Sequence, residues 1–205
     1  MRPRWFLAGL IAFPIAAALC AAIFLKVRSD GFSARTPPGP FEAAVALRVR
    51  NYAIPAAARS LPNPIPDSSE VEAEARAHWA DHCAACHAND GSGDTPLGKQ
   101  LYPPAPDMRQ ARTQQMTDGQ LFYIIENGVR LTGMPAWGSP GSDPNDSWKL
   151  VRFIRRLPHL SLTEIQEMES LNPKTPDERK EEQDEKQFLS GGEMHEDPAA
   201  HHHHH

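Results

Sequence analysis

The sequence of 205 residues predicts a small all-α domain joined to an N-terminal membrane-spanning helix. Helix-capping patterns precede several stretches in which apolar residues recur at helical spacing. No stretch alternates apolar and polar residues for long enough to predict a β-strand. Residues 6–25 carry no charge, and these 20 residues are long enough to cross the ~30 Å hydrocarbon core of a bilayer.

The apolar stretch 6–25 predicts a retained transmembrane anchor, which with its flanks occupies residues 1–28. Two arginines precede the stretch and a lysine and an arginine follow it, so the flanking charges do not fix its orientation. A cleaved signal peptide is the alternative, but its apolar region would be about 7–15 residues long and followed by a polar stretch. Cys20 fits a small apolar residue of the anchor, and a lipid-modified cysteine is the rival interpretation.

Residues 29–68 are predicted to be a proline-rich linker or docking segment. Residues 36–40 (TPPGP) interrupt regular structure, and prolines alternate through residues 61–66 as in extended polyproline II chain. The stretch between them, Phe41–Tyr52, is compatible with a short helix. As a spacer the segment would hold the next domain off the membrane, and as a docking segment Phe41–Ile65 would wrap that domain. The sequence leaves both open.

Residues 69–172 are predicted to fold as the helical domain. Capping patterns and apolar periodicity predict four helices, at about residues 70–83, 117–128, 147–157 and 161–171. Ser69 and Glu72 have capping-box spacing at the first of these helices, and Pro158 is expected to stop the third.

Residues 173–205 are predicted to be a charged tail. Residues 177–186 mix many charges with almost no apolar side chains, which indicates a solvated helix or a disordered segment. The final run His201–His205 is typical of a purification tag. A native metal-binding tract that also uses His195 is the alternative.

Composition excludes two classes of protein. The net charge of −5 gives no basic surface for nucleic acid, so nucleic-acid binding is not expected. Three cysteines are too few for a disulfide scaffold.

The strongest chemical signal is Cys83-Ala-Ala-Cys86-His87. Two thiols separated by two residues can reach both vinyl groups of a haem, and the histidine that follows falls under the iron, so this motif is typical of c-type haem attachment. A zinc site would need further cysteine or histidine ligands at ribbon or finger spacing, and the rest of the chain after residue 25 has no other cysteine. A thioredoxin-like pair would need a preceding strand, where a helix is predicted instead.

Met134 is the best candidate for the second axial ligand. It lies in an irregular loop, 131–137 (LTGMPAW), where Gly133 permits close approach of the backbone and Pro135 stiffens the presentation of the sulfur. A methionine at helical spacing would more often be a core residue. His78, His82 and His159 are possible substitutes.

Residues 70–157 resemble the class I c-type cytochromes, in particular the monohaem proteins of bacterial respiratory chains. The motifs that carry the resemblance occur in that family's order: HCAACH (82–87), LYPPAPDM (101–108), LFYIIENGV (121–129) with LTGMPAW (131–137), and SWKLVRFIRRLP (147–158). The resemblance implies a helical fold around one covalent haem c, with Met134 as distal ligand.

The resemblance also implies neighbours of the haem. A carbonyl of Pro103 or Pro104 would accept the N–H of His87 and so orient the imidazole. Trp137 would lie beside a propionate or the haem edge, and a core aromatic is its alternative role.

These observations predict a one-electron carrier rather than an enzyme, with redox proteins as donor and acceptor and no small-molecule substrate. It would work in a respiratory chain or as the cytochrome subunit of an oxidoreductase complex. Haem attachment outside the cytoplasmic membrane implies a cytoplasmic N-terminus and a periplasmic haem domain. A haem-based sensor or a peroxidase-like enzyme, in which the methionine ligand is displaced, is the alternative function.

Overall fold

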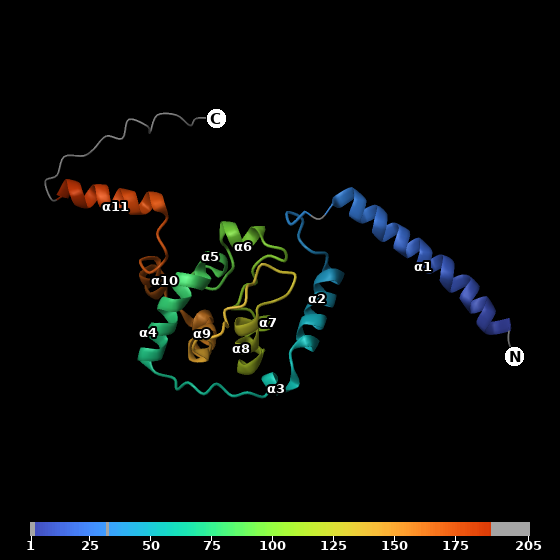
Figure 1. Cartoon of the computed structure of the whole chain (residues 1–205), viewed down its shortest axis with the longest axis horizontal. Helices are drawn as coiled ribbons and strands as arrows, with labels where there is room; N and C mark the ends of the chain where they lie inside the picture. The colour runs from blue at the N-terminus through green and yellow to red at the C-terminus, as the bar shows by residue number, and fades with distance from the viewer. Residues whose placement is uncertain (1–2, 32, 190–205) are drawn as a thin grey trace, which may run out of the picture.

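The computed structural model describes residues 3–31 and 33–189, which are helical with no strand (Figure 1). This agrees with the predicted all-α class. The elements in order are α1 (Pro3–Asp30), α2 (Pro40–Ala53), α3 (Ala56–Arg59), α4 (Ser69–His78), the π-helical turn η1 (Trp79–Cys83), α5 (Ala84–His87), α6 (Pro96–Gln100), α7 (Ala111–Gln114), α8 (Asp118–Asn127), α9 (Pro144–Arg156), the 3₁₀ turn η2 (Leu157–His159), α10 (Leu162–Glu169) and α11 (Pro176–Leu189).

Helix α1 stands apart from the remainder of the fold (Figure 1). Its stretch Leu10–Ser29 is long and apolar enough to cross a membrane, with a mean hydropathy of 2.4 and none of it buried against the protein. Pro14 lies inside the helix. The helix is therefore suited to a single-pass membrane anchor by its length and composition.

The core of the domain lies where α4 and α8 pack against α9. The apolar side of α9 is buried and carries much of this core, including Val151, Phe153 and Ile154. The indole of Trp148 stacks on the ring of Phe122 with centroids 4.0 Å apart. Trp79 is buried and packs against Phe153, with ring centroids 5.5 Å apart. A framework of α4, α8 and α9 thus surrounds the start of the cysteine motif.

Two predicted capping boxes are present, at Thr117 with Gln120 and at Ser161 with Glu164. The predicted box at Ser69 is wrong, because Ser68 is the N-cap of α4 and its hydroxyl accepts from the N–H of Val71. The third predicted helix begins earlier than expected, at Pro144, since the carboxylate of Asp143 caps it.

Residues 54–65 run along the domain and are fastened to it. Ile54 is buried in the core. The side chain of Asn63 donates to the carbonyl of Trp148 over 3.0 Å, and the guanidinium of Arg152 donates to the carbonyl of Ile65 over 2.6 and 3.0 Å. Residues 54–65 therefore lie against the domain and are hydrogen-bonded to it.

The charged tail begins with α11, whose side chains are largely exposed. Of the two interpretations, the structure shows the solvated helix for residues 176–189. His195 and the His201–His205 run lie outside the described residues.

Candidate functional site

The three motif residues lie at the end of one continuous helical path, α4–η1–α5. Cys83 is the last residue of the π-helical turn, and Cys86 and His87 end α5. The N–H of Ala84 donates to the carbonyl of Trp79, which closes the wider turn. Short π-helical turns within α-helices are frequent at functional sites, because the wider turn changes the direction of the side chains that follow.

Both motif cysteines are free thiols and are partly buried. Burial, with a contribution from neighbouring Cys86, raises the pKa of the Cys83 thiol to about 12. Cys83 therefore stays protonated at neutral pH. The two sulfurs are not joined in a disulfide, so both remain available for covalent attachment.

His87 combines burial with a missing hydrogen-bond partner. Its Nδ1 atom is buried and makes no hydrogen bond in the structure, and burial lowers the pKa of the imidazole. The ring packs against the indole of Trp79, with centroids 5.8 Å apart. Buried polar atoms in proteins almost always have partners, so the unpartnered Nδ1 atom of His87 is an exception, shared with the Nε atom of Arg156. A neutral imidazole is the form that binds iron.

The chain immediately after His87 is held in a strained conformation. Ala88 has φ of 61° and ψ of 161°, a combination that glycine adopts far more readily than alanine. Several hydrogen bonds hold it there. The indole Nε1 of Trp79 donates to the carbonyl of Ala88 over 3.0 Å, and the N–H of Gly93 donates to the carbonyl of His87 over 2.9 Å. These bonds fix the direction in which the backbone leaves His87.

A proline segment lies against this turn, but with a different proline from those predicted. No carbonyl accepts from His87 Nδ1, so the expected bond to Pro103 or Pro104 is not formed in the structure. A Cβ on Gly93 would lie 2.5 Å from the carbonyl oxygen of Ala105 and 3.2 Å from the carbonyl oxygen of Pro106. Pro106 is thus a neighbour of the turn that the sequence did not single out, because nothing local distinguishes it among closely spaced prolines.

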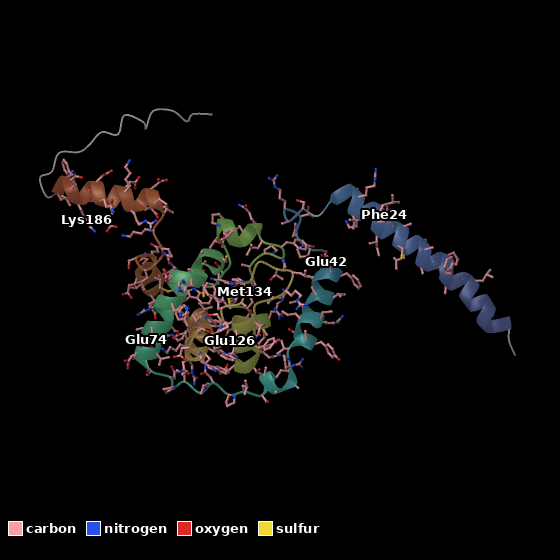
Figure 2. All side chains as sticks on the ribbon, in the orientation of Figure 1. Phe24, Glu42, Glu74, Glu126, Met134 and Lys186 are labelled. Atoms are coloured by element: carbon pink, nitrogen blue, oxygen red, sulfur yellow. The ribbon has the colours of Figure 1, made fainter. Side chains whose placement is uncertain are left out.

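The Met134 loop is folded on itself and on the segment before α7. The N–H of Val129 donates to the carbonyl of Met134 over 3.1 Å, and the N–H of Met134 donates to Thr132 Oγ1 over 3.1 Å. A Cβ on Gly133 would lie 2.5 Å from the side chain of Leu101, so this side chain would have to shift to admit a larger residue. Met134 is partly buried, and Figure 2 shows it toward the middle of the domain, on the loop after α8.

An aromatic contact joins this loop to the cysteine motif. The indole of Trp137 stacks on the imidazole of His82, with ring centroids 5.4 Å apart. His82 also contacts His78 edge to face at 5.0 Å, and burial, followed by the charge of His82, lowers the pKa of His78. The motif helix and the methionine loop therefore meet through His82 and Trp137. The sequence assigned no such contact to His82, and no local signal predicts it.

The residues present fit a covalently bound haem: two free thiols, a partly buried imidazole whose Nδ1 atom has no hydrogen-bond partner, and a methionine on an adjoining loop. Among the residues that the structure describes, no group of three or more His, Cys, Asp or Glu side chains is placed to hold a metal ion. His159, an alternative axial ligand, is exposed in η2.

Comparison with known proteins points to the same class. Residues 70–154 match the family described as cytochrome c oxidase, cbb3-type, subunit III. No curated protein matches the chain. The matched region contains the cysteine motif, Met134 and most of α9. Residues 70–154, which carry the cysteine motif and Met134, are therefore similar to a c-type cytochrome domain.

Proposed function

We propose that this chain is a membrane-anchored monohaem cytochrome c that transfers one electron at a time between redox proteins of a respiratory chain. The observation that carries the proposal is the joint position of Cys83, Cys86 and His87 at the end of one helical path, inside the region that matches the cytochrome family. The proposal adds three things to the similarity: one covalent haem, the axial ligands of its iron, and a location at the cytoplasmic membrane.

One haem c would be attached through Cys83 and Cys86 and ligated by His87 and Met134, and it would supply an Fe(III)/Fe(II) couple. A histidine–methionine pair raises the reduction potential, which suits a carrier. Trp137 would lie at the edge of this site, since it already contacts the residue before Cys83.

The chain's own residues supply rigidity. The hydrogen bonds around Ala88 and the stack between His82 and Trp137 hold the two ligand-bearing segments in place. The core behind the motif, formed by Trp79, Phe153 and their neighbours, excludes water. A site that changes little between two charge states needs little reorganisation, which favours fast electron transfer.

The proposed location follows from the anchor and from the attachment chemistry. Helix α1 would span the cytoplasmic membrane once, with the N-terminus in the cytoplasm and the cytochrome domain in the periplasm. The matched family's description names a subunit of an oxidase, so a second form of the proposal places the chain as the cytochrome subunit of an oxidoreductase complex.

Absorption spectroscopy of the full chain from a haem-maturing host tests the proposal. We expect a c-type spectrum after reduction, a mass increase of one haem, and no change when carbon monoxide is added, because Met134 fills the sixth position. A rapid carbon monoxide shift would favour the sensor or peroxidase-like alternative. If protein from such a host shows no haem spectrum, the carrier, sensor and peroxidase-like hypotheses are all refuted.

A further inference from the structure

The outward face of α2 is apolar. Phe41, Val45, Val49 and Tyr52 recur at intervals of four, four and three residues, which places them on one face of the helix. They are 83%, 41%, 61% and 88% exposed, respectively. A helix on the surface of a soluble domain normally turns polar residues to water. These four residues are called the α2 stripe below. No apolar surface of the described protein covers them.

A few side-chain contacts join α2 to the domain and leave the stripe facing outward. The guanidinium of Arg50 donates to the sulfur of Met116 over 3.8 Å. The hydroxyl of Tyr102 donates to the carboxylate of Glu42 near the start of the helix. Ile54, directly after its last residue, is buried in the core. The orientation of the stripe is thus set by contacts at both ends of the helix.

The position of α2 in the chain brings the stripe near a bilayer. The apolar stretch of α1 ends at Ser29 and α2 begins at Pro40. At no more than ~3.6 Å per residue, the connecting chain reaches about 35–40 Å. In Figure 1, α2 forms the flank of the domain on the side of α1. A domain tethered so closely keeps this flank within reach of the membrane surface.

The charge around the stripe also suits a membrane. Residues 26–59 contain six basic and two acidic side chains, a local net charge of +4 in a chain whose overall charge is −5. Basic side chains near an apolar helical face attract anionic lipid headgroups. Phe41 and Tyr52, near the two ends of the stripe, are aromatic, and aromatic side chains are typical of the apolar faces of helices that lie in the interface.

We propose that the α2 stripe lies in the headgroup layer of the bilayer that α1 spans, and so fixes how the cytochrome domain is oriented on the membrane. The inference rests on the proposed anchoring by α1. It deepens that anchoring from a simple tether to two attached points, a helix across the bilayer and a helix along its surface. A partner protein seated on the stripe is the competing occupant.

Photo-cross-linking of the full chain separates these occupants. The variant Tyr52→benzoylphenylalanine places a photoreactive group on the stripe, at a side chain so exposed that folding is unaffected. Phe13→benzoylphenylalanine in α1 reports on anchoring, and Ala73→benzoylphenylalanine on α4 is the surface control. In Figure 2 the neighbouring Glu74 lies on the flank opposite Glu42 of α2. Each variant is irradiated in vesicles of phosphatidylcholine and phosphatidylglycerol and in native membranes, and adducts are identified by mass.

Lipid adducts at positions 13 and 52, with several-fold less at position 73, are the expected result in both settings. Lipid adducts at position 13 without any at position 52, or a protein adduct at position 52 in native membranes, would overturn the inference and leave the anchor standing. Loss of lipid adducts at position 13 would overturn anchoring and the inference together. The haem spectrum of the same sample tests separately whether haem is bound, as the proposed function requires.

Discussion

The imidazole of His82 lies face to face with the indole of Trp137, at an angle of 21° between the ring planes. His82 immediately precedes Cys83, and Trp137 follows Met134 by three residues. The backbone N–H of Trp137 also donates to the carbonyl of Ile125 over 3.0 Å, which fixes the loop to the end of α8. The loop that presents Met134 is therefore positioned by an aromatic contact with the cysteine motif and, with Gly138 after it, by two backbone bonds to α8.

Replacing Trp137 tests the aromatic contact. We expect Trp137→Ala to lower the free energy of unfolding by about 1–2 kcal/mol, since it removes an aromatic pair and part of its buried area. The reduced variant should also bind carbon monoxide more readily, because the Met134 loop is less firmly held. Trp137→Phe keeps a stacking ring and should stay near wild type. Carbon monoxide titration and guanidinium unfolding measure both effects, and an Ala variant that matches wild type in both would contradict the role.

Met134→Leu tests the assigned axial ligand. The change conserves volume but removes the sulfur, so the sixth position should open and carbon monoxide should bind the reduced protein. The reduction potential should fall by on the order of 0.1 V or more, because axial ligands set haem potentials over a wide range. Met108→Leu is the matched control, a methionine packed beside the core, and should leave the potential unchanged. A normal potential in the Met134 variant would refute the assignment.

The sequence predicted those helix starts that are set by residues close together in the chain. The capping boxes at Thr117 and Ser161 need only residues three positions apart, and both are present. At the start of α4, Ser68 and Ser69 are adjacent and each is a plausible cap, so the choice depends on how α4 packs against α9. A one-residue error at this helix start follows from that dependence.

Features that depend on contacts between residues far apart in the chain could not be predicted from the sequence. The proline-rich composition of residues 29–68 is typical of a linker, yet Ile54 is buried because α3 approaches α8 closely. The conformation of Ala88 depends on the bond from the indole of Trp79, nine residues earlier. The motif itself identified Cys83, Cys86 and His87 because haem attachment chemistry fixes their spacing, whatever the fold.

Gly119→Ala tests whether residues 54–65 are a packed part of the domain. A Cβ at Gly119, in the first turn of α8, would overlap the carbonyl oxygen of Ala58 in α3. The backbone cannot yield cheaply, so we expect a loss of about 1–3 kcal/mol in the free energy of unfolding. Gly39→Ala, where a Cβ meets nothing within 4 Å, is the matched control and should be close to neutral. Equal stability of the two variants would show that α3 is free to move away.

Ala88→Gly tests the strain beside His87. Glycine adopts the positive φ of this position without a Cβ penalty, so the variant should gain about 1 kcal/mol of stability, less the entropy that glycine loses on folding. Ala85→Gly, on the exposed side of α5, should instead lose about 0.5–1 kcal/mol. Thermal or guanidinium unfolding of the haem-loaded proteins measures both. A loss in both variants would mean that Ala88 is not strained.

A charged network ties the turn after His87 to the proline segment. Arg109 donates to Asp107 over 2.9 and 3.0 Å and to Asp90 over 2.7 Å. These hydrogen bonds from Arg109 lower the pKa of Asp107 from 3.8 to about 2, with a further contribution from the amide of Gln110. The carboxylate is therefore stabilised in its charged form by the folded protein.

Asp107→Asn should make the stability difference from wild type depend on pH. Because the folded pKa is depressed, Asp107 stabilises the fold fully above about pH 4, and this contribution is lost as pH falls toward 2. The side chains of Asp107 and Arg109 are 27% and 36% exposed, respectively. We therefore expect the free energy of unfolding of the variant to differ from wild type by only about 0.5–1 kcal/mol at pH 7. Asp94→Asn, at a more exposed pair with Lys99, should have little effect. Urea unfolding at several pH values measures the difference, and a gap that stays constant from pH 7 down to pH 2.5 would contradict the network's role.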